Sequence, residues 1–207
     1  MANPSIHIEQ TNYISQNPFI KALLANFIDK ICATLISIGA STKQGIDAGC
    51  GEAHMVGHLH ARGVLGDIVA VDVNNDYLAY AKGKYPYYDF LAADLIRLPF
   101  ADRTFDYVIS TEVFEHLDDP ISAIMELRRI GKKEAYLIIS VPFEPFFHVG
   151  NIARGKYWNR GGYTPDHRNL WRRNDFRKFL TPLVHIEREY GFKSFPWLLF
   201  VCRFKSL

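Results

Sequence analysis

Short apolar runs alternate with helix-like segments along this chain, and this alternation constrains the fold more than any other feature. The first unit is a strand-like Gly45–Ala48, a turn at Gly49–Gly51 and a helical segment over 53–62. The apolar run Ile68–Val71 is typical of a buried parallel strand, and Asn74 is placed to cap the helix that follows. A strand, a crossover helix and a second strand predict a βαβ unit.

The same alternation continues to the end of the chain. Further strands are expected over 87–91, 105–109, 135–141, 183–190 and 197–204, and further helices over 18–39, 120–130 and 175–180. The last two strands flank a turn region from Gly191 to Pro196, which predicts an antiparallel hairpin. The expected fold class is therefore α/β: a doubly wound, Rossmann-like, mainly parallel seven-stranded sheet with a C-terminal antiparallel hairpin.

The length of 207 residues is that of one ordinary domain, so we expect residues 1–207 to form a single domain. Residues 1–40 would be an N-terminal helical segment. Residues 143–172 follow the fifth expected strand and are long for a connection. Because ligands bind at the carboxyl ends of the strands in such sheets, we expect this insertion, the lid, to cover a substrate.

Charge and cysteine content exclude several classes of protein. The chain has 24 Lys and Arg against 22 Asp and Glu, so a strongly basic nucleic-acid-binding protein is not expected. Residues 151–180 nevertheless hold eight basic and two acidic residues, which leaves open a local site for an anion. Three cysteines without a pairing pattern favour a reducing compartment, and no apolar stretch resembles a leader or a membrane span, so a cytoplasmic location is expected.

The turn after the first strand has the composition of a nucleotide-binding loop. Glycines at 49 and 51 let the backbone turn sharply and approach a ligand. Asp72 lies 21 residues beyond Gly51 at a strand end, where a carboxylate can accept both ribose hydroxyls. A dinucleotide fingerprint would need glycine where His54 stands, which disfavours a pyrophosphate. Asp94, after the third strand, can accept a hydrogen bond from an adenine amino group. Among enzymes that bind such a nucleotide, a dehydrogenase is a distant alternative.

These segments, together with several later ones in the same order, resemble the class I S-adenosylmethionine-dependent methyltransferases, particularly the group that includes the ubiquinone-pathway enzymes. The resemblance rests on Gly45–Glu52, Ala70–Asp72, Ala93–Leu95, Leu98–Phe100, Phe105–Asp106, Glu112–Leu117 with Asp119–Pro120, and Ser140–Pro142. It implies S-adenosylmethionine as cofactor. The cofactor-binding residues it implies are Asp47, Gly49, Cys50, Gly51, Asp72, Val73, Asp94, Leu95 and Thr111.

The resemblance also implies roles for these residues. Asp47, Gly49 and Gly51 would shape the methionine pocket, and Asp72 would hold the ribose. The adenine would lie against Val73, with its amino group at Asp94. Many members have glycine where this chain has Ala53, so we expect a slightly more crowded first helical turn.

The catalytic candidates are Glu112, Glu115, His116 and His167. A sulfonium methyl group is already activated, so the protein must align a nucleophile and provide a proton acceptor or a metal ion. If residues 112–116 form a helical turn, both glutamates and His116 converge on one face. This arrangement resembles ubiquinone-pathway O-methyltransferases and bacterial small-RNA 2′-O-methyltransferases. The latter add a later histidine, here His167, and both groups imply a divalent metal.

A metal-free interpretation is the favoured one. Similar Glu-His-Leu segments occur in class I methyltransferases that use no metal, where the histidine packs, binds substrate or acts as a general base. No Asn-Pro-Pro-Tyr-like segment follows the fourth strand, which favours transfer to oxygen. The lid contributes aromatic and basic side chains that suit a small or lipid-linked, anionic acceptor. The substrate-binding candidates are Tyr13, His148, Arg154, Arg160 and Arg168.

The expected function is therefore O-methylation of a small or lipid-like metabolite that could be anionic. The alternatives are a metal-dependent RNA 2′-O-methyltransferase, against which the isoelectric point of 8.4 argues, and a noncatalytic protein that binds S-adenosylmethionine. We expect no nucleic-acid partner. The sequence leaves the methyl acceptor and the oligomeric state open.

Overall fold

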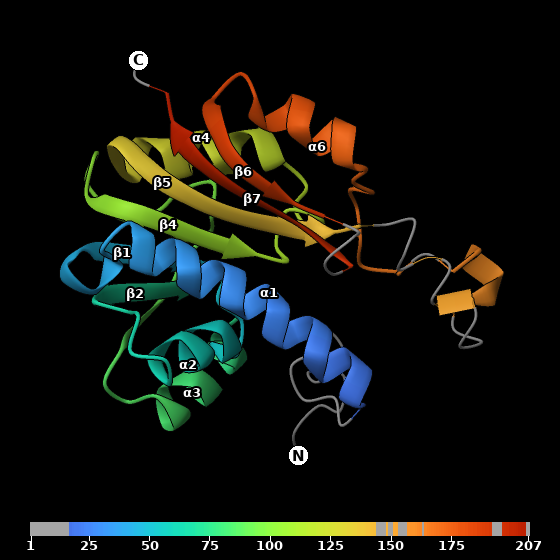
Figure 1. The fold of residues 1–207 in the computed structure, drawn as a ribbon, viewed down its shortest axis with the longest axis horizontal. Helices are drawn as coiled ribbons and strands as arrows, with labels where there is room; N and C mark the ends of the chain where they lie inside the picture. Colours follow the sequence, from blue (N-terminus) through green and yellow to red (C-terminus); the bar gives the residue numbers. More distant parts are fainter. Residues whose placement is uncertain are drawn as a thin grey trace.

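The computed structural model describes residues 17–143, 148, 151–152, 157–162, 164–191 and 196–205. Its centre is a seven-stranded sheet with the order β3-β2-β1-β4-β5-β7-β6 (Figure 1). The strands from β3 to β5 pair in parallel, and β7 pairs antiparallel with both β5 and β6. The strands are β1 Gln44–Ala48, β2 Asp67–Asp72, β3 Asp89–Ala92, β4 Phe105–Thr111, β5 Gly131–Pro142, β6 Val184–Tyr190 and β7 Trp197–Phe204. The expected fold class, including the terminal hairpin, is confirmed.

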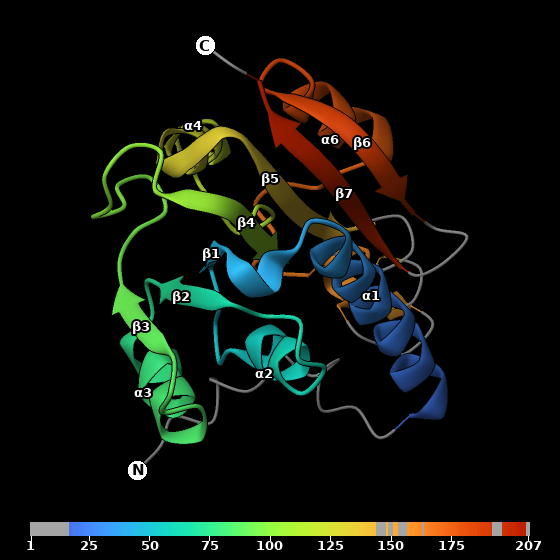
Figure 2. The same ribbon diagram turned by 60° about the vertical axis from the view of Figure 1, so that its left-hand side comes forward.

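Helices cover both faces of the sheet (Figures 1 and 2). The helices α1, α2 and α3 pack on one face, and α4 and α6 pack on the other. Their bounds are α1 Pro18–Ser37, α2 His54–His60, α3 Asn75–Lys84, α4 Pro120–Ile130 and α6 Arg173–Leu180, with 3-10 turns η2 Ala40–Thr42 and η3 Trp158–Arg160. No helix in the described ranges combines the length and the apolar character that crossing a bilayer requires.

The sequence pattern of β4 explains which of its side chains face the helices on each side of the sheet. Tyr107 and Ile109 pack with α1, whereas Val108 between them packs with α4 and α6. Such alternation is the period of two that a strand imposes. Gly45 of β1 lies beside Tyr107, and a Cβ there would stand 2.1 Å from the tyrosine ring. The aromatic side chain therefore fits only because residue 45 has no side chain.

The helix ends follow the expected capping rules with one difference. Asn17 accepts a hydrogen bond from the amide of Phe19 at 2.9 Å, and Pro18 is the first residue of α1. Helix α4 ends before Gly131 as expected, but Gly131 has an extended backbone conformation (φ −72°, ψ 139°) and is already the first residue of β5. The expected strand over 135–141 is therefore too short. Residues 132–134 at the start of β5 are polar, Glu134 has a φ of 61°, and the pairing with β4 shifts register nearby. Because no apolar run marks this bulged part of the strand, the sequence does not reveal where β5 begins.

Candidate active site

The loop after β1 is folded tightly against the end of β2. The amides of Gly49 and Cys50 both donate to the carbonyl oxygen of Val71, at 2.8 and 2.9 Å. Gly49 has a φ of 84°, and a Cβ at this position would come within 2.4 Å of the Val113 side chain. Glycine at 49 is therefore required both by the backbone angle and by the close approach of the next loop.

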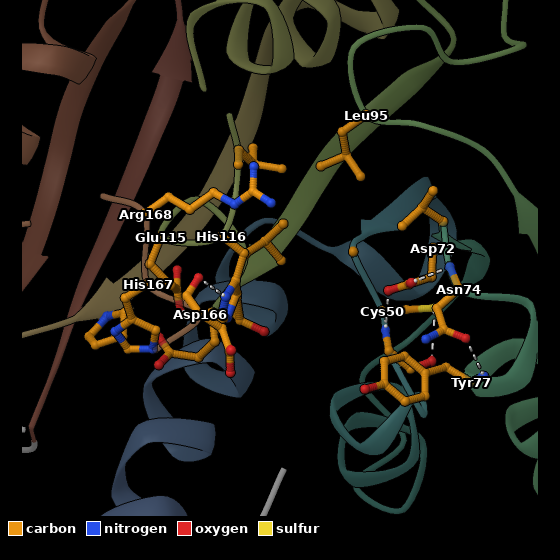
Figure 3. A pocket seen from close by; sticks show the side chains of 18 of the residues that line it. Cys50, Asp72, Asn74, Tyr77, Leu95, Glu115, His116, Asp166, His167 and Arg168 are labelled. Carbon is orange, nitrogen blue, oxygen red and sulfur yellow. Dashed lines mark hydrogen bonds and ion pairs between the residues drawn. The ribbon is translucent and has the colours of Figure 1, made fainter. Parts of the chain in front are cut away.

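Asp72 at the end of β2 ties this loop in place. One carboxylate oxygen accepts a hydrogen bond from the amide of Gly51 and the other from the amide of Asn74, each at 2.8 Å. Asp72 lines a cavity, and Figure 3 shows its side chain with Cys50, Asn74 and Tyr77 on one side of it. Each carboxylate oxygen can accept a second hydrogen bond, so Asp72 can still bind hydroxyl groups of a ligand.

Ala53, where the resemblance predicted glycine, has an unusual backbone conformation. Ala53 is fully buried and precedes α2 with a φ of 58°, in the left-handed region. The side chain is tolerated, but the backbone conformation favours glycine. Alanine at this position therefore carries a backbone cost that glycine would not.

One cavity of about 680 Å³ opens at the carboxyl ends of the central strands. All nine residues expected to bind the cofactor line this cavity, and so do all four catalytic candidates and Arg168. The structure thus brings together segments that follow β1, β2, β3 and β4. The lining also includes Asn74, which was expected only as a helix cap, and Tyr157, one of the lid aromatics. Residues of the lining to which no sequence pattern assigned a role at a site are Tyr77, Asn151, Thr164, Asp166 and Trp197.

Asp47 is the most unusual of the lining residues. It is 1% exposed, and its Oδ2 atom has no hydrogen-bond partner among the residues described. Burial, and secondarily the negative charge of Asp72, raise the pKa of Asp47 to about 7. A buried carboxylate oxygen without a partner is costly, so its presence at a cavity fits a ligand that brings a positive charge or a hydrogen-bond donor.

The raised pKa of Asp47 makes the unfolding free energy depend on pH. Between about pH 4 and pH 7 the folded state holds a proton that the unfolded chain has released, so the free energy of unfolding falls as pH rises. Asp47→Asn should flatten this fall and be more stable than the wild type at pH 8 by at least about 1 kcal/mol. Urea unfolding at pH 5 and pH 8 measures the difference. Asp89→Asn, an exposed carboxylate at the start of β3, is the control and should show no such gain. An Asp47→Asn protein that loses stability equally at both pH values would contradict the assignment.

Residues 112–116 do not form the expected helical turn. Glu112 has a φ of 58°, and its side chain accepts a hydrogen bond from Ser140 Oγ at 2.9 Å. The turn begins only at Val113, whose carbonyl accepts from the amide of His116. Glu112 therefore does not share one helical face with the other two candidates, although it lines the same cavity.

Glu115, His116 and His167 form the cluster that the turn was expected to build with Glu112. One ligand atom from each of the three lies within 4.8 Å of the others, which is close enough for a shared metal ion. Figure 3 shows them together on the side of the cavity opposite Asp72. Glu115 is 1% exposed, and the rings of His116 and His167 meet edge to face at 5.2 Å.

The tautomer of His116 follows from its neighbour. Its Nδ1 atom lies 3.1 Å from the carbonyl oxygen of Asp166. A carbonyl only accepts hydrogen bonds, so Nδ1 carries the hydrogen and, in the neutral ring, Nε2 carries the lone pair. Nε2 lies 3.8 Å from Glu115 Oε1. An imidazole held in this way can accept a proton or ligate a metal through Nε2.

The substrate candidates are placed unevenly. Arg168 lines the cavity and forms an ion pair with Asp118. His148 lies beside Gly162 and is not among the residues that line the cavity. Tyr13, Arg154 and the side chain of Arg160 lie outside the described residues. Among the residues described, carboxylates outnumber cations in the lining, so the basic character of residues 151–180 is not reproduced there.

Comparison with known proteins gives a consistent result. A family model described as a methyltransferase domain matches residues 46–139. A probable S-adenosylmethionine-dependent methyltransferase of Mycobacterium tuberculosis is 30% identical over 105 residues, which are 51% of this chain and 38% of that protein. The chain thus spans about two fifths of the length of the curated relatives it matches.

Solved structures show the same fold at low sequence identity. A protein of Pyrococcus horikoshii superposes with a TM-score of 0.73 at 18% identity, covering 99% of this chain and 100% of that one. Magnesium protoporphyrin IX methyltransferase of Synechocystis, solved with bound SAH, has a TM-score of 0.66 at 20% identity, covering 92% of this chain and 88% of that one.

Proposed function

Because the chain belongs to the class I S-adenosylmethionine-dependent methyltransferases, we propose that it transfers a methyl group from S-adenosylmethionine to a hydroxyl group of a small or lipid-linked molecule. The observation that carries this proposal is the single cavity that Asp72 and the Gly49–Gly51 loop share with Glu115 and His116. A cofactor bound at one end would present its reactive group to an acceptor at the other.

The residues at the cofactor end fit this ligand. When bound, S-adenosylmethionine supplies a methyl group on a positively charged sulfur. The buried, unpartnered Oδ2 of Asp47 suits a ligand with a positive charge, and Asp72 retains lone pairs for two ribose hydroxyls. Val73, at 69% exposed, presents an apolar surface for the adenine, and Asp94 can accept from its amino group.

His116 is the proposed proton acceptor. An attacking hydroxyl forms a bond from its oxygen to the methyl carbon as the carbon–sulfur bond breaks, and its proton passes to Nε2 of His116. The hydrogen bond from Nδ1 to the Asp166 carbonyl holds the ring in the tautomer that this step needs. Glu115, buried next to His116, would stabilise the resulting imidazolium.

A metal-assisted version of the same transfer has its own supporting observation. Glu115, His116 and His167 bring an oxygen and two ring nitrogens close enough to hold a divalent ion. Such an ion would lower the pKa of a bound hydroxyl and replace the need for a base.

The test uses radiolabelled S-adenosylmethionine with a panel of phenols, sugars, lipid-linked phosphates, amines and short RNAs. We expect label to appear on a hydroxyl compound, and no label on RNA. Turnover unaffected by EDTA supports the base mechanism, whereas loss with EDTA and recovery with Mn²⁺ supports the metal version. A protein that fails to bind S-adenosylhomocysteine in calorimetry would overturn the proposal.

A further inference from the structure

The last part of the lid, residues 164–171, is here called the strap; it leads to α6 and lies on the turn 113–117 after β4. The amides of Arg168 and Asn169 both donate to the carbonyl oxygen of Glu115, at 2.8 and 3.0 Å. Figure 3 shows Asp166, His167 and Arg168 of the strap around Glu115 and His116. Two segments about 50 residues apart in sequence thus form one unit at the site.

Asn169 makes three hydrogen bonds between the strap and this turn. Besides its backbone contact, its side-chain Nδ2 donates to the carbonyl oxygen of Leu117 at 2.6 Å and to that of Phe114 at 3.2 Å. Phe114 is fully buried and Glu115 nearly so. Asn169 thereby supplies donors to three carbonyls of one turn.

The end of the strap toward α6 is fixed by aromatic packing. The Trp171 ring lies 5.0 Å from Phe176 and 5.2 Å from Phe179, between ring centroids. Phe114 of the turn packs on the same two rings. Trp171 thus anchors the strap to the core, while Asn169 fixes where the preceding residues lie on the turn.

The position of the strap decides what His116 can do. The carbonyl that accepts from His116 Nδ1 belongs to Asp166, three residues before Asn169. If the strap shifts along the turn, this acceptor moves away and the ring loses the partner that selects its tautomer. Free histidine side chains favour the opposite tautomer, with the hydrogen on Nε2.

We propose that Asn169 is a positioning residue: by clamping the strap to the carbonyls of Phe114 and Leu117, it holds the Asp166 carbonyl against His116 and fixes the hydrogen of that ring on Nδ1. The catalytic meaning of this clamp rests on the proposed role of His116 as proton acceptor. The contacts explain why an amide serves at 169, since a carboxylate of the same shape offers no donor and repels the carbonyls.

The test measures the tautomer directly. In protein labelled with ¹⁵N-histidine, long-range proton–nitrogen spectra distinguish Nδ1–H from Nε2–H rings, and His116→Gln assigns the signal. We expect Nδ1–H for His116 in the wild type and a predominant Nε2–H form in Asn169→Asp. Asn75→Asp, an exposed residue of α3, is the matched control and should keep the wild-type signal. Binding of S-adenosylhomocysteine should change less than about twofold in either variant.

The outcomes separate the clamp from the proposed activity. An Nε2–H ring in the wild type, or an unchanged Nδ1–H ring in folded Asn169→Asp, overturns the clamp. If Asn169→Asp does not fold, Asn169→Ser, which keeps one donor, replaces it and should give a mixture of the two tautomers; an unchanged Nδ1–H ring in that variant also overturns the clamp. If the wild type does not bind S-adenosylhomocysteine, the proposed function is overturned, but the conclusion about the His116 tautomer is unaffected.

Discussion

Asp72→Ala should weaken binding of S-adenosylmethionine by at least about 100-fold, a loss of roughly 3 kcal/mol. Two effects combine in this variant. The carboxylate that can accept two ribose hydroxyls disappears, and hydrogen bonds to a charged acceptor contribute about 1.5–3 kcal/mol each. The amides of Gly51 and Asn74 also lose their shared acceptor, so the loop proposed to contact the cofactor is held less firmly.

Isothermal titration calorimetry with S-adenosylhomocysteine measures this loss. Asp76→Ala is the matched control, because Asp76 lies four residues further on, is exposed in the first turn of α3 and does not line the cavity. It should bind as the wild type does. Equal affinities of Asp72→Ala and the wild type would remove Asp72 from the site. Binding of a nicotinamide dinucleotide by the wild type would revive the rival dehydrogenase interpretation.

The sheet could be predicted from sequence because its signals are local. Most of the buried parallel strands contain a short apolar run, and Asn17, Asn74 and Asp119 cap the helices that follow them. The start of β5 was missed because residues 132–134 are polar and bulged, so no apolar run marks them. Strand boundaries at bulges depend on pairing with a neighbour, which one segment of sequence does not encode.

That the residues proposed to bind the cofactor line one cavity was predictable for the same reason, since they lie at or directly after the ends of strands. The acceptor end was less so. The left-handed φ of Glu112 breaks the spacing argument that grouped it with Glu115 and His116. Asn169 acts through carbonyl groups of a turn about 50 residues away, and such a contact leaves no periodic signal in the sequence. Only the folded chain reveals it.

His116→Gln should lower the turnover number by about 10²–10⁴-fold while leaving S-adenosylhomocysteine binding within about twofold of the wild type. Glutamine keeps the polarity and approximate size of the side chain but accepts a proton far less readily than imidazole. His116 lies beside Glu115, on the side of the cavity opposite Asp72, so its loss should not disturb the cofactor end (Figure 3). The assay is methyl transfer to the acceptor that the labelled screen identifies.

His185→Gln on β6 is the control, because His185 is exposed and lies outside the cavity lining, and it should turn over as the wild type does. The effect of metal on the wild type separates the two roles of His116. If His116 is the proton acceptor, EDTA leaves the wild type active, and added Mn²⁺ does not rescue His116→Gln. If it ligates a metal, EDTA inactivates the wild type, and both His116→Gln and His167→Gln weaken Mn²⁺ binding. Full activity of His116→Gln would contradict both roles. The proton acceptor would then have to be another group at this end of the cavity, and Glu115 is the nearest.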